Sequence, residues 1–100
     1  MAAFFNPFSG VVPDRKLSNS ELVRAIRQDL AAEEEAIHGY TAHAEATDNK
    51  IAKRVLMDIA REEREHTGEL QQLLRILLPD EEELQKEGAE EVNEMAAAVQ

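Results

Sequence analysis

The feature of this sequence that most restricts its fold is a pair of apolar stripes with a helical period. The first stripe recurs at steps of three, four or seven residues and comprises Leu22, Ile26, Leu30, Ile37, Tyr40 and Ala44. The second stripe comprises Val55, Ile59, Leu70, Leu73 and Leu77. Such steps place side chains on one face of an α-helix, so both stretches are predicted to be long amphipathic helices.

The beginning of the first helix is marked by a capping box. Ser18 can accept a hydrogen bond from the Glu21 amide while the Glu21 side chain reaches back, so a helix is predicted from there to about Thr47. Residues 1–17 are predicted to form an irregular N-terminal arm. Residues 18–100 are then a single helical domain.

Polar and proline residues separate the remaining helices. Asp48 and Asn49 are predicted to form the turn, and the second helix to span residues 50–78, where Pro79 ends it. A short third helix is expected to open with the carboxylates of residues 80–83 and to be interrupted at Gly88.

Composition excludes several classes of function. Twenty-one acidic and eleven basic residues give a net charge of −10, which disfavours nucleic-acid binding and favours cations. There is no cysteine, so carboxylate and imidazole are the available strong metal ligands. No apolar run approaches the roughly 18 residues that span a bilayer, so no membrane partner is expected.

Each stripe is interrupted near its middle by residues that bind metals. Glu33 fills the gap in the first stripe, and Glu63 and His66 fill two gaps in the second. A carboxylate among Leu and Ile is costly unless a partner or a metal compensates it. Glu33 lies 15 residues before Asp48 and Glu63 lies 15 residues after it, so the two carboxylates are predicted to be level across the hairpin.

One hairpin supplies half of a di-iron site. Four-helix di-iron sites take a Glu from each of two helices and Glu-x-x-His from each of the other two. Glu33 and the 63–66 motif are half of that set. The predicted fold is therefore all-α: an antiparallel two-helix hairpin with a short C-terminal helix, completing a ferritin-like four-helix bundle by dimerisation.

Two motifs carry a resemblance to a known family. Residues 33–40 read Glu-Glu-Glu-Ala-Ile-His-Gly-Tyr, and residues 60–66 read Ala-Arg-Glu-Glu-Arg-Glu-His. In these motifs and in the spacing between them, residues 19–78 resemble the encapsulated ferritins, which are half-sized ferritins held inside encapsulin shells.

The resemblance implies a function and an assembly. Glu33, Glu63 and His66 would bind two iron ions per dimer, with Tyr40 close to the centre. The activity implied is that of a ferroxidase, which oxidises Fe(II) with O₂. The implied partners are other copies in a ring of dimers, expected to be a decamer, and the shell protein of an encapsulin nanocompartment in the cytoplasm.

Two departures from the family pattern concern how metal enters. Many relatives have a Trp where this chain has Gly39, and some have an acid where it has Ala32. The route of metal into the centre is therefore left open by the resemblance. No encapsulin-targeting tail is recognised after Val92.

Other interpretations of the same residues remain open. Glu62 lies four residues before His66 and Glu63 lies three residues before it, so Glu62 competes with Glu63 as the metal ligand. Tyr40 can instead be a core residue. His43 flanks the stripe as a candidate for a secondary metal role. Alternative functions are a rubrerythrin-like di-iron peroxidase and a non-catalytic acidic helical scaffold.

Overall fold

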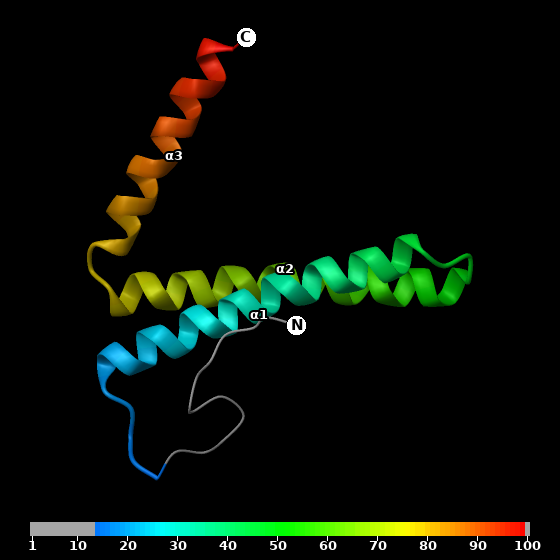
Figure 1. Cartoon of the computed structure of the whole chain (residues 1–100), viewed down its shortest axis with the longest axis horizontal. Coiled ribbons are helices and arrows are strands. Elements are labelled where there is room, and N and C mark those ends of the chain that lie inside the picture. The colour runs from blue at the N-terminus through cyan, green and yellow to red at the C-terminus, as the bar shows by residue number, and fades with distance from the viewer. Residues whose placement is uncertain (1–13, 100) are drawn as a thin grey trace.

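A computed structural model describes residues 14–99, and its elements are three helices. Helix α1 spans Asn19–Glu45, α2 spans Lys50–Leu77 and α3 spans Glu81–Ala98 (Figure 1). The described residues contain no strand, so the prediction of an all-α fold is confirmed. None of the helices in this part of the chain is both long and apolar enough to cross a membrane.

The predicted capping box is present at the start of α1. The Glu21 amide donates to Ser18 Oγ at 3.2 Å, and the Ser18 amide donates to Glu21 Oε1 at 2.9 Å. Arg15 adds a bidentate contact to the Glu21 carboxylate at 2.7 and 2.6 Å. These contacts satisfy amide groups that have no partner within the helix, and so fix where α1 begins.

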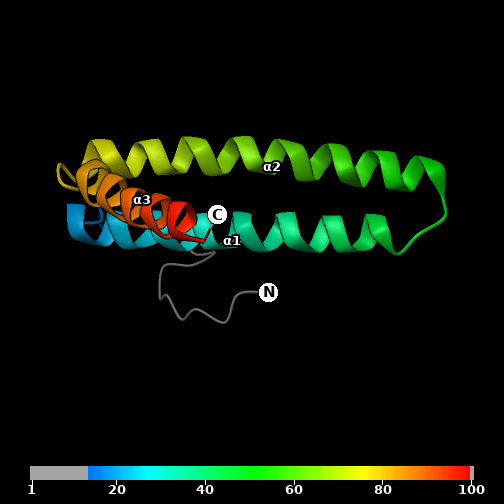
Figure 2. The same cartoon turned by 90° about the horizontal axis from the view of Figure 1, so that it is seen from above.

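Helices α1 and α2 lie side by side and antiparallel, as Figures 1 and 2 show from two directions. Asn49 caps α2 by accepting a hydrogen bond from the Ala52 amide at 2.9 Å. Near the open end of the hairpin, the core is made by seven side chains: Val23, Ile26 and Leu74, with Leu30, Leu70, Leu77 and Leu78 packed against them. Toward the turn, the buried residues Ala44 and Ala60 are small.

Only part of each predicted stripe lies inside the hairpin. Leu22, Val55 and Leu73 were predicted to lie on the core face, but they are 37%, 47% and 39% exposed. Their neighbours in sequence, including Val23 and Leu74, take the buried positions. One helix covers only one side of the stripe on another helix, so the remaining side is left uncovered in a single chain.

An ion pair fixes where α3 leaves the hairpin. Arg27 of α1 donates to both carboxylate oxygens of Glu81, at 3.0 and 3.1 Å, and Glu81 is 9% exposed. Gln85 donates to the same carboxylate and accepts from Arg75 of α2. Figure 1 shows that α3 then runs away from the hairpin rather than along it.

The predicted interruption at Gly88 is wrong, since α3 continues through this residue to Ala98. A glycine inside a helix costs only about 1 kcal/mol relative to alanine. Its neighbours in α3 are mostly Glu, Ala, Gln and Lys, which favour helix strongly enough to offset that cost.

The contact between Glu21 and Arg15 should make stability depend on pH. Hydrogen bonds from Arg15, and then from the Ser18 amide, lower the pKa of Glu21 to about 2. A lowered pKa in the folded state stabilises the fold above the ordinary value of about 4.5, and this contribution is lost as pH falls toward 2. In thermal unfolding followed by circular dichroism, the difference between wild type and Glu21→Gln should therefore shrink across that interval.

A matched control for this experiment is Glu82→Gln, which removes an exposed carboxylate of α3. A pH dependence of the same size in Glu82→Gln would contradict the assignment to Glu21. Direct titration of the Glu21 carboxyl by NMR should give a midpoint near 2.

Replacing Gly88 with alanine should stabilise α3. A Cβ atom at Gly88 meets no atom within 4 Å, so the substitution removes backbone freedom from the unfolded chain without a clash. The expected gain is about 0.5–1 kcal/mol in the free energy of unfolding, with a higher helical signal on heating. Urea titration measures it, and a loss of stability would show that the space is used by a neighbouring molecule.

Candidate metal centre

The structure brings Glu33, Glu63 and His66 together at the centre of the hairpin. Glu33 lies next to the midpoint of α1, Glu63 lies at the midpoint of α2, and His66 follows one turn later. One ligand atom from each residue lies within 4.8 Å of those of the other two. Counting residues from the turn placed the carboxylates level, and the geometry agrees with that prediction.

The contacts within this trio are not hydrogen bonds. His66 Nδ1 lies 3.6 Å from Glu33 Oε2 and 3.6 Å from Glu63 Oε2, which is too long for a hydrogen bond between these atoms. The Glu33 and Glu63 side chains are 28% and 19% exposed, and His66 is 49% exposed. Glu33 Oε2 itself is buried and has no hydrogen-bond partner among the described residues.

This arrangement fits a bound cation. A buried acceptor without a donor costs about 1–3 kcal/mol, and more when it is charged. Two carboxylates side by side also repel each other. Two ligands of one ion bound at about 2 Å can be at most about 4 Å apart, and the 3.6 Å separations satisfy that limit. A metal ion would therefore satisfy Glu33 Oε2 and offset the repulsion at once.

The other candidate residues lie outside the trio. Glu62 is exposed and is not part of the group that could share an ion, whereas Glu63 is. Tyr40 is half-buried on α1, two turns beyond Glu33, and within residues 14–99 its hydroxyl makes no hydrogen bond. His38 and His43 are exposed and do not belong to the group.

Comparison with known proteins defines the class. Residues 11–98 match the model of the Rubrerythrin family. The chain superposes with a TM-score of 0.83 on the crystal structure of an encapsulated ferritin domain from Pyrococcus furiosus, with 32% identity, covering 96% of this chain and 97% of that one. The fold is therefore that of a ferritin-like protein.

Two curated relatives indicate which family of ferritin-like proteins this chain resembles. The chain is 44% identical over 85 residues to the encapsulin nanocompartment cargo protein EncC of Myxococcus xanthus. It is 35% identical over 82 residues to a ferritin-like–encapsulin shell fusion protein of P. furiosus. The matches cover 85% and 82% of this chain but span 65% and 24% of the lengths of the two relatives. The chain belongs to the encapsulated ferritin family.

The unpartnered oxygen of Glu33 gives a test of metal binding that does not depend on activity. Zn²⁺, which has no redox chemistry, should raise the melting temperature of the wild type, because a ligand that binds only the folded state stabilises it. Glu33→Gln should abolish most of that rise. Without metal, it should leave stability unchanged or raise it by up to about 1 kcal/mol, since a buried charge is removed.

The control is Glu34→Gln, at the exposed neighbouring position of α1. It should keep the full metal-dependent rise in melting temperature. Equal loss of the rise in both variants would mean that Zn²⁺ binds to the acidic surface in general rather than to the trio.

Proposed function

We propose that the protein is a ferroxidase that oxidises Fe(II) with O₂ at a two-iron centre shared between two copies of the chain. The observation that carries this proposal is the trio of Glu33, Glu63 and His66, with its unpartnered buried oxygen. Iron is both suited to carboxylate and imidazole ligands and able to give up an electron to O₂. The proposed metal ligands are these three residues.

A second copy is needed because one chain supplies half of a ligand set. Four-helix di-iron sites use four carboxylates and two imidazoles, and each chain offers two and one. Four carboxylates also offset the charge of two Fe²⁺ ions. A two-fold axis through the middle of an antiparallel pair would superpose the midpoints of the helices, where Glu33 and Glu63 lie.

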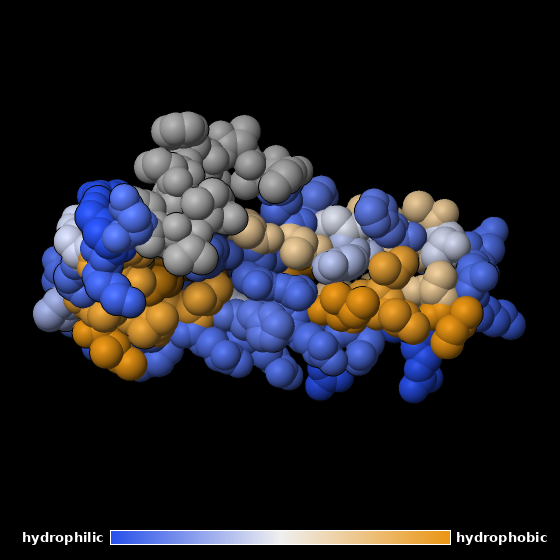
Figure 3. All heavy atoms as spheres, turned by 90° about the horizontal axis from the view of Figure 1, so that it is seen from below, coloured by the Kyte–Doolittle hydropathy of each residue, from blue (hydrophilic) through white to orange (hydrophobic). Residues whose placement is uncertain are grey.

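The surface around the trio supports this mode of pairing. Figure 3 shows the side of the hairpin opposite to α3, where hydrophobic surface at the two ends is separated by hydrophilic atoms. Exposed apolar side chains occur at both ends of α2: Ile51 and Val55 near the turn, and Leu73 and Ile76 near the open end. In an antiparallel pair, the apolar residues near the turn of one chain would cover the apolar residues near the open end of the other. This contact would exclude water from the centre.

The chain's own groups would do separate tasks in the reaction. Glu33 and Glu63 would hold the incoming Fe²⁺ ions, and His66 would add a nitrogen ligand on the more exposed side. Each Fe²⁺ would supply one electron, so a pair supplies two electrons to one O₂ molecule. Tyr40, on the same side of α1 as Glu33, is proposed to lie near the centre once the partner has covered it.

The proposed setting is an encapsulin shell in the cytoplasm, where the oxidised iron would be stored. The support is that one relative is an encapsulin cargo protein and that another is fused to a shell protein. A hairpin of this size cannot enclose a mineral, so storage requires an outer container. We propose that dimers join into a ring, expected to be a decamer, inside that container.

Anaerobic Fe²⁺ titration with native mass spectrometry tests the shared centre. The expected result is about one iron per chain, found only in dimers or larger species. Glu63→Ala and His66→Ala should each lower iron binding and the initial rate of Fe²⁺ oxidation by at least about tenfold, since each removes a ligand. Glu62→Ala is the control and should retain both.

Three results would each contradict a part of the proposal. Stoichiometric iron in monomers would show that the centre is not shared. Loss of iron in Glu62→Ala but not in Glu63→Ala would show that the wrong carboxylate was assigned. Faster Fe²⁺ consumption with peroxide than with O₂ would favour the peroxidase of the rubrerythrin type, which the family match also allows.

A further inference from the structure

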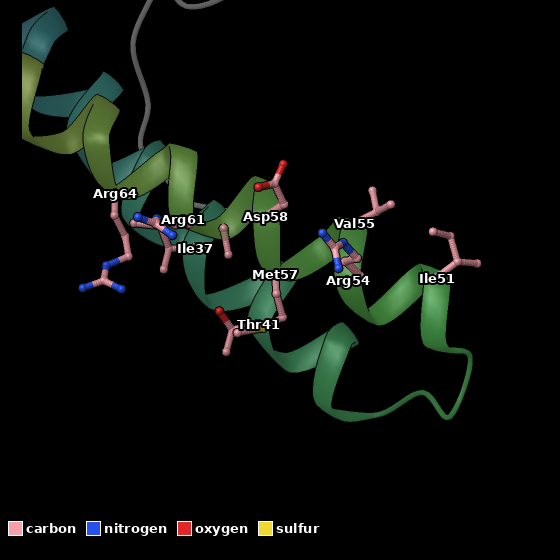
Figure 4. Close-up of a pocket in the computed structure, with 10 residues that line it drawn as sticks. Ile37, Thr41, Ile51, Arg54, Val55, Met57, Asp58, Arg61 and Arg64 are labelled. Atoms are coloured by element: carbon pink, nitrogen blue, oxygen red, sulfur yellow. The ribbon is translucent and has the colours of Figure 1, made fainter.

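A groove lined by three arginines lies near the turn of the hairpin (Figure 4). Its volume is about 640 Å³, and its cationic residues are Arg54, Arg61 and Arg64 of α2. Apolar atoms come from Met57 of α2 and Ile37 of α1. Because cationic and apolar groups alternate along it, the groove suits an amphipathic acidic segment better than a small anion.

The groove points away from the metal centre. Arg64 and His66 are two residues apart, about 200° round the helix, so their side chains project in nearly opposite directions. Ile51 and Val55 also line the groove, but in Figure 4 they point away from Met57. A molecule seated on the arginines and Met57 would therefore leave the face of the trio free.

Among the residues that the structure describes, the three arginines have no anionic partner. No ion pair and no hydrogen bond joins the guanidinium group of Arg54, Arg61 or Arg64 to any residue from 14 to 99. This is unexpected in a chain with 21 acidic residues and a net charge of −10. Asp58 is the acidic residue of the groove, so the groove keeps a positive charge that a negative partner would complement.

Helix α3 carries the negative charge that would complement the groove. Its 18 residues include seven Glu and one Lys, and every residue after Glu81 is exposed. Three apolar residues of α3 share one side of it with Val99, which follows its last residue, and all four are more than half exposed: Leu84, Val92, Met95 and Val99. Glu87, Glu91 and Glu94 flank this side. In proteins, most of the stability of a helix comes from packing its apolar face rather than from helix propensity alone.

The groove of the same chain is not the partner of α3. The contacts of Arg27 with Glu81 and of Arg75 with Gln85 direct α3 away from its own hairpin (Figure 1). Folding back along α2 would require those contacts to break, including the buried carboxylate of Glu81. Within residues 14–99, the groove is therefore not available to α3 of the same chain, whereas the groove of a second copy is.

We propose that α3 of a second copy lies in the arginine groove, and that the exchange is reciprocal. In an antiparallel two-fold pair, the open end of one hairpin lies beside the turn of the other, so α3 of each copy begins close to the groove of its partner. At about 1.5 Å per residue, α3 is about 27 Å long and can cover the roughly 15 Å between Arg54 and Arg64. Its glutamates would then pair with the arginines, and Met95 and its apolar neighbours would meet Met57.

This contact differs from the one proposed for iron binding because it uses the opposite side of the hairpin. A chain with two separate self-contacts can join more than two copies. The failure of one contact would not imply the failure of the other. The centre could bind iron in a simple dimer even if α3 were free.

Charge reversal tests the pairing. One variant carries Arg54→Glu, Arg61→Glu and Arg64→Glu, another carries Glu87→Arg, Glu91→Arg and Glu94→Arg, and a third carries all six changes. Each triple variant should weaken assembly beyond the dimer at least about tenfold, because like charges then face each other. The sixfold variant has the wild-type net charge of −10 and should restore assembly. Native mass spectrometry and sedimentation measure the species.

A control of equal charge change is the triple variant Lys16→Glu, Arg24→Glu and Lys86→Glu, whose sites are exposed and outside the groove. It should assemble as the wild type does. Iron bound per chain should be unchanged in the triple variant of the groove and in the triple variant of α3, which separates this contact from the metal centre. Unaltered assembly in the groove variant, or no restoration in the sixfold variant, would overturn the proposal.

The absence of cysteine allows a second, geometric test. A Met57→Cys chain mixed with a Met95→Cys chain should give a disulfide-linked heterodimer under mild oxidation. The control Ala89→Cys, on the other side of α3, should give at least tenfold less of it. A chain carrying both Met57→Cys and Met95→Cys that closes mainly on itself would show that α3 folds back, and would overturn the proposal.

Discussion

A carboxylate oxygen of Glu33 lies buried between two helices beside a second carboxylate and an imidazole, and no residue from 14 to 99 donates a hydrogen bond to it. This group determines what else the molecule must do. In the interior, an unsatisfied charged acceptor costs more than the net gain from a typical hydrogen bond. Glu33 lies near the middle of the interface between α1 and α2, where an apolar residue would stabilise the hairpin more. A bound cation would compensate this cost, and the ligand types present are suited to iron.

The need for further metal ligands also accounts for the apolar residues that the hairpin leaves exposed. Part of each apolar stripe is uncovered, with Leu22, Val55 and Leu73 exposed on either side of the trio. The residues inside the hairpin fix the relative height of α1 and α2, whereas the uncovered residues can fix only the position of another molecule. In the proposed dimer, a second copy would complete the ligand set and bury the apolar residues that one chain leaves exposed. Stability and metal binding should be coupled through assembly.

Sequence predicts the parts of this structure that depend on local contacts and on counting. The capping box of Ser18 and Glu21 and the turn at Asn49 use residues close in sequence, and the level placement of Glu33 and Glu63 follows from regular helical rise. The choice between Leu22 and Val23, or Leu73 and Leu74, as the buried residue depends on how two helices cross. A periodicity cannot distinguish adjacent positions so finely. The predicted interruption of α3 at Gly88 rests on one residue that disfavours helix, whereas its neighbours, which favour helix, decide the outcome.

The direction of α3 was beyond prediction for a different reason. It depends on Arg27 meeting Glu81, which is 54 residues away in sequence, and on Arg75 meeting Gln85. Those contacts become apparent only when the hairpin is folded. They also explain how the charge of the chain is distributed: the acidic α3 is held away from the hairpin, while arginines near the turn lack partners within it. In the proposed pairing, these complementary surfaces would meet between copies, which would favour assembly over a closed monomer.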